Sequence, residues 1–171
     1  MQVNFYEKAI AVTPIERFGL VDPDDKEGKF PAFLSYDSTV DKWNATVVCN
    51  NRCDYNFIPV DNCLNITLMR DGVEETASTC DAMLYTPKTV CFVELKKDKK
   101  GGDWLEKAVY QIENTIGFFG EKEMAKYENA RAYICNTRRH FIPTIHSNIQ
   151  QAFYKANGLV LRIKTEIEEL K

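Results

Sequence analysis

The stretch that decides the fold reads Cys80-Asp81-Ala82-Met83-Leu84-Tyr85, then a turn containing Pro87, then Val90-Cys91-Phe92-Val93-Glu94-Leu95-Lys96. Both runs are apolar, and we expect them to form two adjacent, buried strands. Side chains alternate along a strand, so Glu94 and Lys96 share one face. The other face takes Cys91, Val93 and Leu95. Two carboxylates and one ammonium group therefore converge within an apolar hairpin.

This convergence points to a metal site. A buried ionised side chain costs free energy unless it is paired or bound to a metal. Asp81, Glu94 and Lys96 lie together in apolar surroundings, and a bound cation is the simplest reason for keeping them there. The alternative is a structural ion pair between Glu94 and Lys96 on an edge strand.

The composition is that of an ordinary globular protein. Of the 171 residues, 44% are apolar and 27% are charged, so a single domain over residues 1–171 is the simplest organisation. No apolar run is long enough to span a bilayer, and the N-terminus lacks the apolar segment of a signal peptide. We therefore expect a cytoplasmic protein with no membrane contact, reduced cysteines, and chance glycosylation sequons at Asn44 and Asn65.

The charge distribution leaves nucleic acid open as a ligand. The formal net charge of −3 argues against a globally basic nucleic-acid binder, but nucleases concentrate acids at the metal and bases around it. Any single basic cluster is more typical of a solvated charged face. All three clusters, however, lie in the part of the chain that carries Asp81 and Glu94, which we call the acidic pair. The clusters are Lys96-Lys97 with Lys99-Lys100, Arg138-Arg139-His140, and Lys155 with Arg162 and Lys164.

The segment before Asp81 gives uneven structural signals. Turn residues, helix-start residues and alternating apolar positions set the expected elements. These are a short helix over 4–11, a second helix beginning at Thr13-Pro14, a loop over 22–28, a strand over 43–49, a short extended piece over 56–60, and a hairpin turning at Asp71-Gly72.

Helices and strands alternate after Lys96. Apolar residues recur at helical spacing after Asp103, a suitable N-cap, and Gly120 is expected to end this helix. Apolar patterns then predict a strand over 130–136, a helix over 145–156, a strand over 159–164 and a charged, frayed tail over 166–171. The order from Asp81 is β-β-α-β-α-β, which implies a mixed sheet with helices packed on it.

The motif and its placement resemble a known superfamily. Asp81, twelve intervening residues, Glu94-Leu95-Lys96, a helix and a strand are similar to the PD-(D/E)XK nucleases, which include type II restriction endonucleases, archaeal Holliday-junction resolvases and RecB-type exonuclease domains. The family proline before the aspartate is Cys80 here. The resemblance implies an α/β (α+β) fold with a restriction-endonuclease-like core over 61–165, a central mixed β-sheet flanked by helices. Residues 1–60 remain an N-terminal, β-rich extension of unknown role.

The resemblance also implies roles for individual residues. Asp81 and Glu94, with the main-chain carbonyl of Leu95, would bind Mg²⁺, with Mn²⁺ as a substitute. Lys96 would orient or help deprotonate the attacking water and stabilise charge on the scissile phosphate. Gln111, on the following helix, would support the metal site or contact DNA, although a solvated glutamine there is equally plausible.

Further contacts are expected around this centre. The candidates for binding nucleic acid are Lys97, Lys107, Arg138 and Arg139. Many family members add a glutamate from an N-terminal helix, and the sequence leaves Glu7 and Glu16 open for that role.

Cysteine and histidine offer weaker alternatives. A zinc site from Cys49, Cys53, Cys63 and Cys80 has irregular spacing and no CxxC pair, so buried strand thiols are the preferred interpretation. His140 and His146 have no evident metal or nucleophile partner.

The leading hypothesis is therefore a metal-dependent nuclease that hydrolyses phosphodiester bonds, with DNA as the expected substrate, in defence, repair or recombination. A homodimer would suit the cutting of two strands. The alternative is a catalytically inactive nuclease-fold protein that serves in binding or interaction. An accidental motif on an unrelated α/β protein would place the two strands apart.

Overall fold

The computed structural model describes residues 3–23, 29–37, 43–97, 102–137 and 143–171. The elements in chain order are the 3-10 helix η1 (Phe5–Lys8), β1 (Ile10–Ala11), β2 (Arg17–Val21), β3 (Phe33–Ser35), β4 (Ala45–Val48), β5 (Asn56–Pro59), β6 (Thr67–Arg70), β7 (Val73–Thr76), β8 (Ala82–Tyr85), β9 (Thr89–Lys96), α1 (Trp104–Met124), β10 (Asn129–Asn136), α2 (Pro143–Asn157), β11 (Val160–Ile163) and β12 (Glu166–Ile167).

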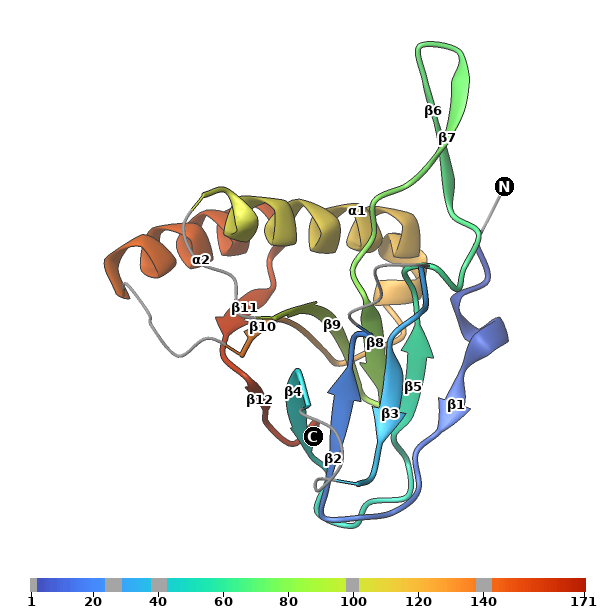
Figure 1. The fold of residues 1–171 in the computed structure, drawn as a ribbon, viewed down its shortest axis with the longest axis vertical. Coiled ribbons are helices and arrows are strands. Elements are labelled where there is room, and N and C mark those ends of the chain that lie inside the picture. The colour runs from blue at the N-terminus through green and yellow to red at the C-terminus, as the bar shows by residue number, and fades with distance from the viewer. Residues whose placement is uncertain (1–2, 24–28, 38–42, 98–101, 138–142) are drawn as a thin grey trace.

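A central mixed sheet organises the molecule. Its six strands follow the order β1-β5-β8-β9-β10-β11, antiparallel from β1 to β9 and parallel from β9 to β11. The expected order β-β-α-β-α-β from Asp81 is confirmed, as is the mixed α/β class. Both helices lie on one side of the central sheet, and the β6–β7 hairpin projects away from the body (Figure 1).

Each face of the central sheet contributes to its own apolar cluster. Met83 and Phe92 pack with α1 and α2 residues on the helical side. Cys91, Val93 and Leu95 pack on the opposite side against a second sheet, of order β12-β4-β2-β3. The alternation predicted for β9 is thus confirmed, and the molecule has three layers with β8 and β9 in the middle.

Several local predictions hold because short-range chemistry decides them. The strand expected over 43–49 is β4, and the extended piece over 56–60 is β5. Asp71 and Gly72 have φ of 52° and 80°, as a tight hairpin turn between β6 and β7 requires. The helix after Asp103 is broken at Gly120, as expected, because Gly120 has φ 80° and ψ 159°, and a short second helical segment follows it to Met124.

Three predictions are wrong. Residues 13–16 do not start a helix; the chain enters β2 instead, where Phe18 and Leu20 are completely buried. The helix expected over 4–11 is only the single 3-10 turn of η1, capped by the side chain of Asn4, and Ile10–Ala11 form the strand β1. The tail is not frayed, because β12 pairs with β4 and Leu170 is fully buried. Alternation of so few residues is a weak signal, and tertiary packing decides in each case.

The N-terminal residues are interwoven with the rest of the chain. β1 and β5 belong to the central sheet, while β2, β3 and β4 form the second sheet with β12 from the other end. No helix within the described residues is both long and apolar enough to cross a bilayer.

Candidate metal centre and catalytic residues

The pairing of β8 with β9 brings the two acidic residues together. Ala82 pairs with Val93, so Asp81, one residue earlier, faces Glu94 one residue later. Residues that face each other in an antiparallel pair project on the same side, here the helical side. Glu94 is 0% exposed and Asp81 is 8% exposed. The two strands are adjacent, as the motif requires.

Lys96 completes the predicted group. Its ammonium donates to Glu94 Oε1 and, over 3.2 Å, to Gln111 Oε1 on α1. The backbone N–H of Leu95 donates to Asp81 Oδ2 over 2.6 Å. The structure therefore joins Glu94, Lys96 and Gln111 by hydrogen bonds at the end of β9 and places Asp81 beside them, opposite Glu94 and bonded to the Leu95 N–H.

Helix α1 fixes the segment that leads into Asp81. Gln111 Nε2 donates to the carbonyl of Thr79 over 3.0 Å. The Thr115 hydroxyl accepts the N–H of Cys80 and donates to the carbonyl of Gln111, both over 2.8 Å. Asn114 Nδ2 donates to the carbonyl of Ser78 over 2.9 Å. Three consecutive backbone groups are thus held by one face of α1.

Burial shifts the titration of both carboxyl groups. Burial and the nearby charge of Asp22 raise the pKa of Asp81 to about 7, against the opposing effects of the Leu95 N–H and Lys96. Burial and the charge of Asp81 raise the pKa of Glu94 well above its ordinary value. Two close carboxylates in a water-poor site disfavour each other's charge, and a cation between them relieves that cost.

Lys96 stays an ammonium group. Burial lowers its pKa, but Glu94, Asp81 and Asp22 raise it by more, so the net shift is upward. A protonated lysine donates hydrogen bonds and stabilises negative charge, and it does not accept a proton. Of the two roles expected for Lys96, orientation and charge stabilisation fit this environment better than deprotonation of water.

Two further aspartates adjoin the cluster, and the sequence did not single them out. Asp61 lies just after the end of β5. The preceding residue, Val60, donates its N–H to the carbonyl of Asp81 over 3.0 Å. Burial raises the pKa of Asp61, and the charge of Lys96 opposes that shift. Asp22 follows β2 in the second sheet and acts on Asp81 and Lys96. Both aspartates come from strand ends far away in the chain, so no local pattern identifies them.

The donors present fit a hard divalent cation. Glu94 Oε2 is buried without a hydrogen-bond partner within the described part of the chain. Within those same residues, no three or more His, Cys, Asp or Glu side chains are grouped so that they could share a metal ion. A cation here would therefore rest on Asp81, Glu94, the Leu95 carbonyl and water. Mg²⁺ prefers oxygen donors of this kind and keeps several waters.

The other predicted positions are more scattered. Lys107 is exposed and pairs with Asp103 one turn earlier, at 3.1 Å. Lys97 is exposed and directly follows Lys96. Arg138, Arg139 and His140 lie outside the described residues, and His146 is on α2.

Neither N-terminal glutamate is among the main charges acting on the site. The charged neighbours with the largest effect on Asp81 are Asp22, Lys96 and Asp61, and Glu7 and Glu16 are not among them. The other acidic side chains that act on Asp81 follow the ends of β2 and β5.

The positions of the cysteines argue against a shared zinc site. Cys49 packs in the cluster between the two sheets, whereas Cys80 packs in the helical cluster on the other face of the central sheet. Cys53 is exposed. Burial raises the pKa of the Cys91 thiol to about 12, as expected for an unreactive strand cysteine.

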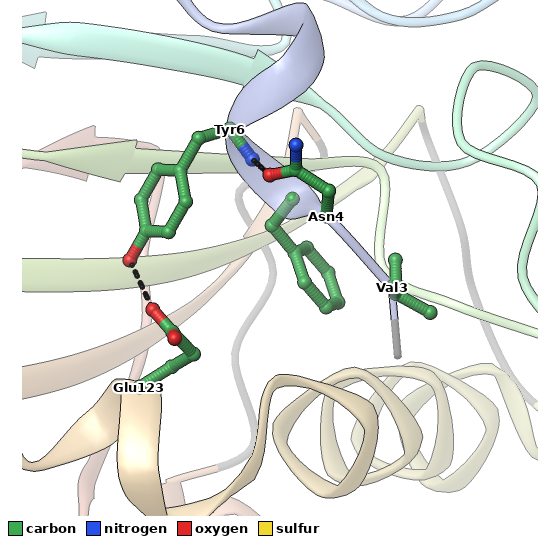
Figure 2. Close-up of a pocket in the computed structure, with 5 residues that line it drawn as sticks. Val3, Asn4, Tyr6 and Glu123 are labelled. Atoms are coloured by element: carbon green, nitrogen blue, oxygen red, sulfur yellow. Dashed lines mark hydrogen bonds between the residues drawn. The ribbon is translucent and has the colours of Figure 1, made fainter. Parts of the chain in front are cut away.

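A separate cavity of about 270 Å³ lies beneath η1. Figure 2 shows its lining, in which the Tyr6 hydroxyl donates to Glu123 Oε2 over 3.0 Å and the Asn4 side chain accepts the N–H of Tyr6. Tyr127 also contacts the Tyr6 hydroxyl at 3.0 Å. This network fastens η1 to the end of α1 and includes none of the acidic pair, so we assign it a structural role.

Comparison with protein-family models, with curated proteins and with solved structures gives no match to this chain.

Proposed function

We propose that this chain is a metal-dependent nuclease that hydrolyses phosphodiester bonds of nucleic acid, with DNA as the expected substrate. The observation that carries the proposal is the cluster of Asp81, Glu94 and Lys96, in which a buried acid pair meets an ammonium group. A restriction-endonuclease-like core is part of the proposal. Its support is the antiparallel β8–β9 pair followed by α1 and the parallel strand β10.

Each residue then has a distinct task. Asp81 and Glu94, with the Leu95 carbonyl, would hold Mg²⁺ or Mn²⁺, which when bound lowers the pKa of a water and neutralises charge on the phosphate. Lys96 would donate to the attacking water or to a phosphate oxygen. Gln111 holds Lys96 through Oε1 while its amide nitrogen is tied to Thr79, so the ammonium is positioned before substrate arrives.

The test is cleavage of linear duplex, circular duplex and single-stranded DNA, and of RNA, in Mg²⁺ or Mn²⁺ and in EDTA. We expect metal-dependent cutting that falls about 100-fold or more in Asp81→Ala and in Lys96→Ala. Lys88→Ala is the matched control, because Lys88 is an exposed lysine just before the opposite end of β9 and pairs with Glu128.

Two outcomes would contradict the proposal. Cutting that survives in both site variants would place the chemistry elsewhere. Failure of the wild-type protein on every substrate, together with no rise in thermal stability on adding Mg²⁺ or Mn²⁺, would favour the catalytically inactive binding protein.

A further inference from the structure

Two aromatic rings stand exposed at the start of β3. Phe30 is 56% exposed and Phe33 is 41% exposed, and Lys29 precedes them in the chain. On β3, Leu34 packs inward against the cluster between the sheets, so Phe33 points to the outer face. We refer to Lys29, Phe30 and Phe33 as the aromatic strip.

The strip begins at the edge of the molecule that carries the acidic pair. Val21 pairs with Phe33 in the antiparallel strands β2 and β3. The next residue, Asp22, therefore lies beside Ala32. Asp22 acts electrostatically on Asp81. Burial raises the pKa of Asp61, and among charged groups Lys29 has the largest opposing effect on that pKa. Asp22 therefore acts on the proposed metal centre directly, and Lys29 acts on Asp61 beside it.

We propose that the aromatic strip binds single-stranded nucleic acid and guides it into the site, which makes unpaired strands the preferred substrate. This inference rests on the proposed nuclease function. An exposed phenylalanine ring stacks on a base face without regard to sequence, and an adjacent lysine neutralises a phosphate. In a duplex the bases are already stacked and paired, so their faces are closed to Phe30 and Phe33.

Exposure of the strip argues for a ligand of this chemistry. An isolated exposed apolar side chain needs no explanation, but here two exposed rings and a lysine occur within residues 29–33, a segment that pairs with the strand leading to Asp22. Cation and ring faces complement the two repeating parts of a single strand, its phosphates and its bases. The same combination occurs at Tyr154-Lys155, where Tyr154 is 56% exposed, but that pair lies near Val160 at the opposite end of the sheet.

The experiment measures binding of a labelled single-stranded oligonucleotide by fluorescence anisotropy, in EDTA so that no cleavage occurs, with the same sequence as duplex alongside. We expect the full-length protein to prefer the single strand. Phe30→Ala and Phe33→Ala should each weaken that binding by about tenfold, while Phe30→Trp should retain it. Lys29→Ala should reduce the slope of log affinity against log salt by about 1.

Tyr154→Ala is the matched control and should bind as the wild type does. Because the substituted rings are exposed, thermal melting should show that each variant is folded. Unchanged affinity in both phenylalanine variants, or a preference for duplex, would overturn the inference while leaving metal-dependent cleavage intact. If the wild-type protein neither binds nor cuts any nucleic acid, the proposed function falls with it.

Discussion

At the scale of single residues, the acidic pair carries an electrostatic cost in the absence of a cation. Burial raises the pKa of Asp81 to about 7 in the folded protein, compared with about 4 in an unfolded chain. A carboxyl whose pKa is raised by folding stabilises the fold below its unfolded pKa, and this contribution is lost as the pH rises through the folded pKa. The loss therefore falls between about pH 4 and pH 8, the window in which the site becomes charged.

The first prediction follows for the protein in EDTA. Its free energy of unfolding should fall by about 2–4 kcal/mol as the pH rises through that window, since Asp81 must ionise while buried. Asp81→Asn should flatten this fall and be the more stable protein at pH 8, because an amide oxygen can still accept the Leu95 N–H. Urea denaturation at several pH values measures both effects.

A control separates this effect from general acid sensitivity. Asp103→Asn changes an exposed carboxylate that pairs with Lys107 on the surface, and it should leave the pH dependence as in the wild type. An Asp81→Asn protein that is less stable than the wild type at pH 8 would contradict the account of a costly buried charge.

At the scale of elements, α1 acts as a brace for the entry of the chain into β8. Thr115 is fully buried, and its hydroxyl bonds both the Cys80 N–H and the Gln111 carbonyl. Thr115→Val keeps the shape but leaves the Cys80 N–H without its partner. We expect a loss of about 1–3 kcal/mol in stability and, beyond that, weaker activation by Mg²⁺, because Asp81 follows Cys80 directly.

The measurement is the Mg²⁺ concentration for half-maximal cleavage, taken well below the melting temperature of each variant. Thr115→Ser retains the hydroxyl and should recover the Mg²⁺ response even if some packing is lost. If Thr115→Val lowers stability alone and leaves the Mg²⁺ response unchanged, Thr115 is a packing residue and does not position Asp81.

The same elements show how far the sequence predicts the site. The faces of β8 and β9 follow from alternation of apolar residues, and the pairing register then places Asp81 opposite Glu94. Gln111 was expected only from the resemblance to RecB-type nucleases, beside the equal alternative of a solvated glutamine, and its hydrogen bond to Lys96 places it at the cluster. Asp22 was not expected, because it reaches the site from the end of β2 in the second sheet, and the packing of two sheets leaves no periodic signal in the chain.

At the scale of the whole molecule, strands from both ends of the chain form the second sheet, which packs on the central sheet. β12 adds to the second sheet beside β4, and that sheet covers the face of β9 opposite the acidic pair. Leu170 donates its N–H to the Tyr55 hydroxyl over 2.6 Å, and its carbonyl accepts a hydrogen bond from Arg52 Nη1 over 2.6 Å. The tail looked frayed in the sequence because its charged residues outnumber its apolar ones. Its few apolar side chains, however, enter the core.

Leu170→Ala tests whether the tail is part of the core. Leu170 is 0% exposed and packs in the cluster between the sheets, so truncating it should cost about 2–5 kcal/mol of unfolding free energy, measured by urea denaturation. Met69→Ala, on the projecting β6 where Met69 is 67% exposed, should change stability by less than about 0.5 kcal/mol. Equal stabilities for the two variants would mean that the end of the chain does not hold the sheets together. A large difference would instead show that the C-terminal residues help to hold the second sheet against the central sheet, since Leu170 packs between them.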